Sequence, residues 1–379
     1  MFDPEVWRKV PFHFWSFAFF TFGCTVGSFL NVCIYRMPRN ESVVSPPSHC
    51  PHCNYSIPWY LNIPLLTWLY LRGKCANCGA RISVRYFLVE LLTGVAFLGC
   101  WLSFGAQSAP FALAMCLVMA GFITATFIDL EHFIIPDEIT LGGIVAGFIC
   151  SFFVPELHHT AIVATSLWQS FLGIAIGGGL IYGILRGGKL LFGREKLALA
   201  AEAKIYFTET FLKLPERDVP YEEIFYRNSD VILFQAKRLE MIDRCFVEAS
   251  VRLTPLSLQI GDEKFATEKT PYFEATTNEI TLPREAMGFG DVKFMAAIGA
   301  FLGWPAVFFS LMASSIIGSV VGVVLIVGGR REWSSRLPYG PYIALAATIW
   351  IFSGTGVQNW WIGQLKEFVF LVIKLFGAA

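Results

Sequence analysis

Long apolar runs separated by short polar connections cover most of this chain. The runs lie near residues 12–34, 86–105, 109–130, 138–155, 167–187, 291–303, 305–328 and 339–355. A membrane-spanning helix needs roughly 20 predominantly apolar residues, and most of these runs approach that length. The pattern therefore predicts an α-helical polytopic membrane protein with about eight spans. The last segment, 360–379, carries Lys366 and Lys374, so it could be an interfacial helix or a ninth, short span.

Two polar stretches interrupt the apolar pattern. The stretch 36–85 contains two closely spaced cysteine pairs, and 188–286 carries most of the charged residues. In the second stretch, an Ala- and Glu-rich composition predicts a helix over 194–214, and alternating residues predict strands near 230–235, 244–253 and 256–263. We therefore expect a small soluble α+β insert, in which we find no catalytic motif. The predicted domains are a first transmembrane helix (1–35), a four-cysteine zinc-binding domain (36–85), transmembrane helices with a first candidate catalytic Asp (86–187), the insert (188–286) and further transmembrane helices (287–379).

The bulk composition also indicates a membrane protein. Of the 379 residues, 55% are hydrophobic and 15% are charged, and the mean hydropathy of +0.56 is too high for an ordinary soluble globular chain. Most basic residues lie in 36–85, 186–293 and 330–336, which fall on one side of the membrane if the spans alternate. The positive-inside tendency makes that side cytoplasmic. We therefore expect the four-cysteine domain and the insert in the cytoplasm, and a first span that is retained rather than cleaved as a signal peptide.

Four cysteines in the first polar stretch have the spacing of a metal site. Cys50 and Cys53 form one CxxC pair, and Cys75 and Cys78 form a second. Two such pairs at this separation fit a zinc ribbon, in which four thiolates close a tetrahedral structural site. A cytoplasmic location argues against disulfides, because thiols are kept reduced there. A domain of this size has little core, so we expect bound Zn²⁺ to supply much of its stability.

Two aspartates lie at the ends of apolar runs. Asp129 ends one run, and Asp291 begins another within the stretch Gly288-Phe289-Gly290-Asp291-Val292-Lys293. A carboxylate at membrane depth is costly unless it is solvated, paired or protonated, so each is a functional candidate. The two glycines of this stretch lack a Cβ, which lets the backbone turn tightly and approach a substrate closely. Two membrane-edge aspartates on different helices suggest an aspartyl dyad.

Other polar residues near these helix ends have both a structural and a functional interpretation. For Glu90, inside the second predicted span, bonding to the four-cysteine domain or to a lipid headgroup is about as well supported as a functional role. Asp137 can cap the fourth span at its N-terminus. For Glu131 and His132 we favour solvated charges at the membrane edge.

Several separate motifs, in the right order, resemble one family, the type IV prepilin peptidases. These are bacterial inner-membrane aspartyl enzymes of the GxGD type that also N-methylate their product. The likeness covers most of the chain outside the insert. The motifs that carry it are Gly27-Ser28-Phe29-Leu30-Asn31 with Tyr35-Arg36, the two CxxC pairs, Arg72-Gly73-Lys74-Cys75, Arg85-Tyr86 with Val89-Glu90-Leu91, Ile128-Asp129-Leu130 with Pro136-Asp137, Gly288 to Lys293, and Pro338-Tyr339-Gly340-Pro341.

The resemblance implies an activity and a location. Enzymes of this family cleave prepilins, or the pseudopilins of type II secretion, after a Gly that ends a short basic leader. They then methylate the new N-terminal residue from S-adenosylmethionine. The implied partners are these substrates and membrane lipid, with no nucleic acid, and the implied location is the bacterial inner membrane.

The resemblance also implies residue roles. Asp129 and Asp291 correspond to the catalytic pair. The methyl donor is expected in the four-cysteine domain, near Arg72, Gly73 and Lys74. The residues expected to support catalysis are Gly288, Gly290, Lys293, Asp137 and Glu90.

Three alternatives remain. A transporter or channel could use Asp129 and Asp291 as ion ligands, although acids at the ends of spans rather than at their centres count against it. A non-catalytic assembly scaffold would use the zinc ribbon and the insert as docking surfaces. A peptidase that has lost methylation would keep the dyad.

Overall fold

A computed structural model of the chain describes residues 11–215, 218–225, 230–267, 270, 272–283, 288–328 and 337–376. The chain divides into two compact units. One is built from residues up to 181 together with those from 289 onward, and the other from residues 182–288. The first unit is helical, and the second is built on a β-sheet.

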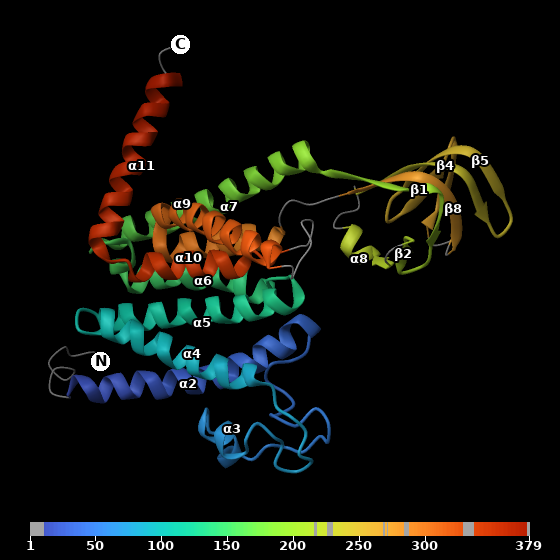
Figure 1. The fold of residues 1–379 in the computed structure, drawn as a ribbon. Coiled ribbons are helices and arrows are strands. Elements are labelled where there is room, and N and C mark those ends of the chain that lie inside the picture. The colour runs from blue at the N-terminus through green and yellow to red at the C-terminus, as the bar shows by residue number, and fades with distance from the viewer. Residues whose placement is uncertain are drawn as a thin grey trace. The chain divides into compact units, whose positions relative to one another are not determined.

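The long helices follow the predicted apolar runs. They are α2 (Phe12–Arg36), α4 (Val84–Cys100), α5 (Ala109–His132), α6 (Asp137–Phe153), α7 (Val163–Phe192), α9 (Phe289–Val327), α10 (Gly340–Phe352) and α11 (Gly354–Phe376). Helices α2, α4, α5 and α6 lie side by side in that order (Figure 1). In the described part of the chain, five helices are long and apolar enough to cross a membrane, or six if the bent pair α10–α11 counts as one span. These helices are those of a membrane protein, and the number of about eight spans stays a prediction.

Short elements fill the connections between these helices. The region between α2 and α4 contains little regular structure, as expected for a small domain organised by cysteines. The short elements are η1 (Met37–Arg39), η2 (Trp59–Leu61), α3 (Leu66–Tyr70), η3 (Trp101–Gly105) and η4 (Pro155–His158).

Helix α9 is broken near its middle. Gly303 has a φ of 74° and a ψ of 172°, and Pro305, which has no N–H, follows two residues later. Because the break removes helical hydrogen bonds, the Ala300 carbonyl needs other donors. Ser170 Oγ of α7 donates to this oxygen at 2.9 Å, and Ser151 Oγ of α6 lies 3.4 Å from it. The break falls between the sixth and seventh predicted runs.

The predicted span 339–355 differs from the structure. Helix α10 has 13 residues, which extend about 20 Å at roughly 1.5 Å per residue, whereas the hydrocarbon core of a bilayer is roughly 30 Å thick. The chain then bends by 112° into α11, so the two helices form a broken span or a re-entrant loop. Figure 1 shows α11 turning away from α10.

Small residues bring helix backbones close together. A Cβ placed on Gly27 of α2 would lie 2.7 Å from a Cα atom of α4. Gly173 of α7 and Gly299 of α9 approach even more closely, since a Cβ on Gly173 would lie 2.0 Å from the Gly299 oxygen. Asn31 Nδ2 of α2 donates to the Tyr86 carbonyl of α4 at 3.0 Å, which adds a hydrogen bond between these helices.

The second unit is an antiparallel sheet. Its described strands have the order β3-β2-β1-β8-β4-β5-β6-β7. Aromatic rings of β1, β4 and β8 stack inside it, with the Phe207 and Phe273 centroids 4.3 Å apart and those of Phe207 and Phe234 5.5 Å apart. The elements are β1 (Arg194–Phe207), β2 (Phe211–Lys213), β3 (Asp218–Pro220), α8 (Tyr221–Ile224), β4 (Ile232–Met241), β5 (Cys245–Leu253), β6 (Ser257–Ile260), β7 (Glu263–Ala266) and β8 (Phe273–Pro283).

The predicted helix over 194–214 is wrong. Strand β1 occupies most of this range and pairs with β8 along its length. The Ala- and Glu-rich composition favours a helix, but burial alternates with a period of two, since Ile205 and Phe207 are buried and Lys204 is exposed. Strand pairing and burial of one face override the intrinsic propensity. The insert is therefore mainly β rather than α+β, although the predicted strands near β4, β5 and β6 are confirmed.

Candidate active site and metal centre

Four cysteine side chains converge between α2 and α4. The sulfur atoms of Cys50, Cys53, Cys75 and Cys78 all lie within 4.8 Å of one another. The Cys50–Cys78 and Cys53–Cys75 sulfur distances are 3.8 Å and 4.0 Å. Tetrahedral Zn–S bonds of about 2.3 Å require sulfur separations of about 3.8 Å. Backbone N–H groups of Cys78 and Asn77 lower the pKa of the Cys75 thiol to about 6, which favours the thiolate that binds metals. The cluster could therefore hold a metal ion.

Each CxxC pair lies in a tight turn closed by a single β-bridge. His49 pairs with Ser56 around the first turn, and Lys74 pairs with Arg81 around the second. Gly79 supplies a φ of 70° in the second turn, directly after the last cysteine, a conformation that residues with a Cβ rarely adopt. The two turns thus present their sulfur atoms toward one another without a larger hydrophobic core.

The residues expected near a methyl donor form a turn after α3. Arg72 and Gly73 have φ values of 51° and 65°, and a Cβ on Gly73 would lie 2.9 Å from the Trp68 ring. That ring packs against Phe87 of α4 with the centroids 5.2 Å apart. Packing and backbone conformation alone account for the glycine. On either side of it, Arg72 and Lys74 are both exposed.

Glu90 is buried in α4 and bonds to the four-cysteine domain. Its Oε2 accepts a hydrogen bond of 2.7 Å from the backbone N–H of Leu65, which precedes α3. Leu65 itself has a φ of 60°, so the chain holds an unfavourable conformation where it meets this carboxylate. The contact corresponds to the structural interpretation of Glu90, a link between a membrane helix and the four-cysteine domain.

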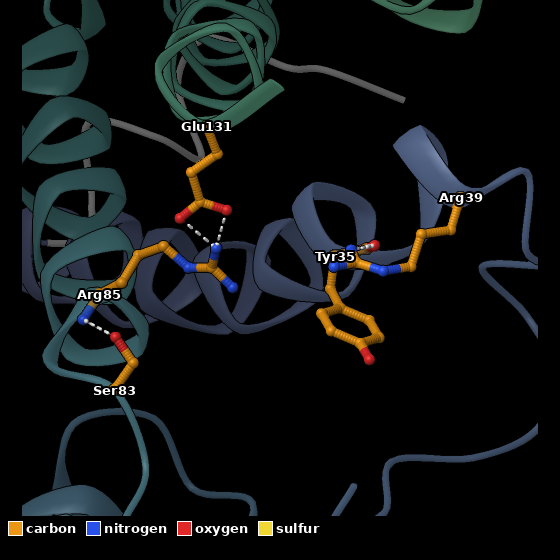
Figure 2. A network of polar contacts seen from close by, with 5 residues as sticks. All are labelled: Tyr35, Arg39, Ser83, Arg85 and Glu131. Carbon is orange, nitrogen blue, oxygen red and sulfur yellow. Dashed lines mark hydrogen bonds and ion pairs between the residues drawn. The ribbon is translucent and has the colours of Figure 1, made fainter. Parts of the chain in front are cut away.

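An ion pair joins the start of α4 to the end of α5 (Figure 2). Arg85 pairs with Glu131, two residues beyond Asp129. The Arg85 side chain is 17% exposed and that of Glu131 is 42% exposed. Glu131 is thus exposed, but it is paired with Arg85 rather than only solvated, and its predicted location at the membrane edge stays a prediction. In the same view, Arg39 donates to the Tyr35 carbonyl, and its guanidinium lies 4.1 Å from the centroid of the Tyr35 ring.

Asp129 is buried in the last turn of α5, with 5% of its surface exposed. The helix ends at His132, and the next residue, Phe133, caps it with a φ of 56° and donates its N–H to the Asp129 carbonyl at 3.0 Å. The Asp129 carboxylate faces α10, and its Oδ2 accepts a hydrogen bond of 2.8 Å from the Gly340 N–H. Sequence reasoning missed this contact. The available signal was the motif Pro338-Tyr339-Gly340-Pro341, whose two prolines mark the start of a helix.

Asp291 is buried in the first turn of α9, with 7% of its surface exposed. Its neighbour Gly290 packs on Ile135, since a Cβ on Gly290 would lie 3.4 Å from Ile135 Cβ. The Cδ1 atom of the same Ile135 would lie 3.1 Å from a Cβ on Gly340, the donor to Asp129. One side chain therefore lies against the backbone next to Asp291 and against the residue that donates to Asp129.

Lys293 connects the first turn of α9 to the first turn of α6. It forms an ion pair with Asp137 and lies 5.3 Å from the centroid of the Phe289 ring. Asp137 does not cap α6 as predicted, because it is the first helical residue and Pro136 holds the N-cap position without a side-chain hydrogen bond. The carboxylate is used instead to anchor the α9 segment that carries Asp291.

Two family models match this chain. Residues 21–104 match the bacterial peptidase A24 N-terminal domain, and residues 116–211 and 272–323 match the type IV leader peptidase family. Residues 212–271 lie between the two segments that match the type IV leader peptidase model. Strands β3 to β7 of the insert therefore fall outside that model.

Curated relatives extend the likeness over more of the chain. The prepilin leader peptidase/N-methyltransferase of Myxococcus xanthus strain DK1622 is 34% identical over 287 residues, covering 67% of this chain and 85% of that protein. The protein of the same name from Aeromonas hydrophila is 27% identical over 386 residues, covering 94% of this chain and 97% of that protein. No solved structure was found to match. The chain belongs to the type IV leader peptidase family.

Proposed function

We propose that this protein is a membrane aspartyl endopeptidase that removes the basic leader of type IV prepilins or pseudopilins after a Gly and then N-methylates the new N-terminal residue. The observation that carries the proposal is the pair of buried aspartates, Asp129 at the end of α5 and Asp291 at the start of α9, whose neighbours Gly340 and Gly290 pack on one Ile135. The names of the relatives support both activities.

The chemistry follows from two carboxyl groups in one buried site. Two carboxyl groups that face one reaction centre do not both ionise easily, so we expect the dyad to share a proton and to titrate as a pair. One carboxylate takes a proton from water as the water oxygen attacks the scissile carbonyl. The other carboxyl group protonates the leaving amine as the C–N bond breaks. The Gly288–Gly290 backbone, next to Asp291, leaves room for the substrate chain.

The four-cysteine domain is the proposed location of both a structural metal ion and the methyl donor. We propose a structural Zn²⁺ at Cys50, Cys53, Cys75 and Cys78, which the sulfur distances support. S-adenosylmethionine, when bound, supplies an electrophilic methyl group to the α-amine of the cleaved product. The cations of Arg72 and Lys74, next to Cys75 in the sequence, suit the carboxylate of such a donor.

The proposed orientation places the protein in the bacterial inner membrane. The four-cysteine domain and the insert would lie in the cytoplasm, because their connections carry most of the Lys and Arg residues. Both acids would then lie at the cytoplasmic edge, where water is available. A substrate helix would enter from the bilayer and present its scissile bond there.

Co-expression with a prepilin from the same genome tests the peptidase. We expect wild type to release the leader, and Asp129→Asn and Asp291→Asn to lose cleavage while staying in the membrane, as read by the intact mass of the pilin. Glu138→Gln, an exposed acid in the first turn of α6, is the matched control and should cleave normally. Normal cleavage by either Asp variant would contradict the proposal.

The same intact-mass measurements of the pilin distinguish the bifunctional enzyme from the alternative functions. A product heavier by one methyl group supports N-methylation, and an unmodified product indicates a peptidase alone. A scaffold or an ion transporter would leave the prepilin uncut in every sample. The location of both acids at helix ends and the names of the relatives favour the bifunctional enzyme.

A further inference from the structure

The start of α10 fits tightly against the side chain of Asp129. The Gly340 N–H donates to Asp129 Oδ2 at 2.8 Å. A Cβ on Gly340 would lie 2.7 Å from that same oxygen and 3.1 Å from Ile135 Cδ1. Real Cβ atoms essentially never approach another heavy atom as closely as 2.7 Å, so only glycine leaves the carboxylate where it is.

The position of Gly340 is fixed by α9. The Tyr339 hydroxyl lies 2.9 Å from Ser314 Oγ and 3.0 Å from Ser315 Oγ, both beyond the break in α9. The Tyr342 ring packs on Gly318 of the same helix, since a Cβ there would lie 3.2 Å from the ring. The amide that meets Asp129 is therefore held by the second half of α9, while Asp291 belongs to its first half.

Gly340 is also the first residue of α10, with Pro341 following it. Its N–H has no helical acceptor, because the first four amides of a helix lack one. The Asp129 carboxylate accepts this hydrogen bond across 211 positions of sequence. The positive end of the helix dipole favours a carboxylate at this place.

We propose that Gly340 is a positioning residue of the peptidase, whose amide holds Asp129 Oδ2 and leaves Oδ1 to meet the reacting water or the scissile peptide. This inference rests on the proposed function. In this arrangement α10 sets the rotamer of one catalytic acid, and Tyr339 with its two serine partners sets the position of α10.

The contacts predict how an added methyl group would be accommodated. The two atoms nearest to it, Asp129 Oδ2 and Ile135 Cδ1, are both ends of side chains. Rotation of these side chains relieves the clash without movement of the backbone. Gly340→Ala should therefore fold, with the Asp129 carboxylate displaced. A displacement of about 1 Å at a catalytic group can reduce a rate roughly 100-fold.

The test compares Gly340→Ala with Gly121→Ala on a purified prepilin in detergent or vesicles. Gly121 lies within α5, the helix of Asp129, and a Cβ there meets nothing within 4 Å, so it is the matched control. For Gly340→Ala we expect kcat to fall roughly 100-fold with KM within about threefold of wild type, because substrate binding is unchanged. Methylation of a pilin supplied without its leader should continue at the wild-type rate. Gly121→Ala should match wild type in both assays.

The outcomes separate this inference from the proposed function. If wild type cleaves, Asp129→Asn does not, and Gly340→Ala cleaves at the wild-type rate, the positioning role is wrong and the dyad stands. Equal loss of cleavage and methylation by Gly340→Ala would also overturn the positioning role, since it would indicate a general structural defect. If wild type cleaves no prepilin, the proposed function itself fails.

A second variant decides the case if Gly340→Ala does not accumulate in the membrane. Tyr339→Phe removes the hydroxyl that holds the start of α10 and keeps the ring. We expect a several-fold decrease in kcat with an unchanged KM. Ser314→Ala leaves Ser315 as a partner for the hydroxyl and should have a smaller effect. A wild-type kcat for Tyr339→Phe would overturn the proposal.

Discussion

The helical unit and the inserted sheet place their polar residues differently. In the helical unit, Asp129 and Glu90 are buried and accept hydrogen bonds from backbone amides far away in the sequence. In the second unit, a continuous apolar cluster fills the interior of the sheet, and most of the described ion pairs, such as Lys237–Glu202, lie on the surface, with the buried Asp230, paired with Lys189, as an exception. Burial of a carboxylate is costly and persists where function requires it. The comparison teaches that substitutions of the buried acids in the first unit should remove activity, whereas substitutions in the core of the second unit should mainly reduce stability.

The largest expected effect is the loss of bound zinc from the four-cysteine domain of the helical unit. Cys75→Ser removes one of the four sulfur ligands, and structural zinc contributes roughly 10–16 kcal/mol to the folding of small domains. We expect the zinc content to fall from about one ion per chain to nearly none, measured on the purified protein by elemental mass spectrometry. Cleavage by added protease between α2 and α4 should increase. The control is Cys245→Ser, which changes an exposed cysteine of the sheet, and this variant should retain the zinc content of wild type. Full zinc content in Cys75→Ser would exclude the four-thiolate site.

The next largest expected effect is a loss of stability in the core of the sheet. Phe207 is almost fully buried and stacks on Phe234 and Phe273. Phe207→Ala should reduce the free energy of unfolding of the insert by about 3–5 kcal/mol, read by hydrogen exchange of its strands. Ile242→Ala, at an exposed side chain, should change it little. Because we find no catalytic motif in the insert, kcat/KM of Phe207→Ala for prepilin should stay within about twofold of wild type. A loss of activity in proportion to the loss of stability would contradict the difference between the two units.

The smallest effect concerns the ion pair between Arg85 and Glu131. Partly exposed pairs contribute about 0.2–1 kcal/mol, so Glu131→Gln should reduce cleavage by no more than about fivefold. Arg85→Glu alone should be worse, since it places two acids side by side near Asp129. The exchange of both charges in one variant should recover part of the lost activity. If the double variant is as impaired as the sum of the single ones, the pair does not couple the two helices.

Part of the site was predictable from the sequence because it depends on local pattern. Asp129 and Asp291 each interrupt an apolar run at its end, and an acid in that place is unusual on energetic grounds alone. The CxxC spacing likewise specifies a four-thiolate cluster, and the structure brings the four sulfur atoms together. In each case the information lies within a few neighbouring residues.

Other features were not predictable because they depend on contacts between distant residues. The hydrogen bond from Gly340 to Asp129 spans 211 positions, and the motif around Gly340 marks the start of a helix without indicating its partner. Strand β1 has the composition of a helix, and only its pairing with β8 decides its conformation. The ion pair between Asp137 and Lys293 likewise requires α6 and α9 to meet. A single sequence gives no direct information on such contacts between distant segments.

The pairing of β1 with β8 has a consequence for the way the insert is accommodated within the chain. Arg194 lies opposite Pro283 in the sheet, and paired residues of antiparallel strands are about 5 Å apart. The polypeptide thus enters the sheet at the start of β1 and leaves it at the end of β8, at nearly the same point. The separation of these two ends is as small as that of the two ends of a short turn. A domain whose two ends lie this close together can be accommodated within a chain without displacing the segments on either side of it.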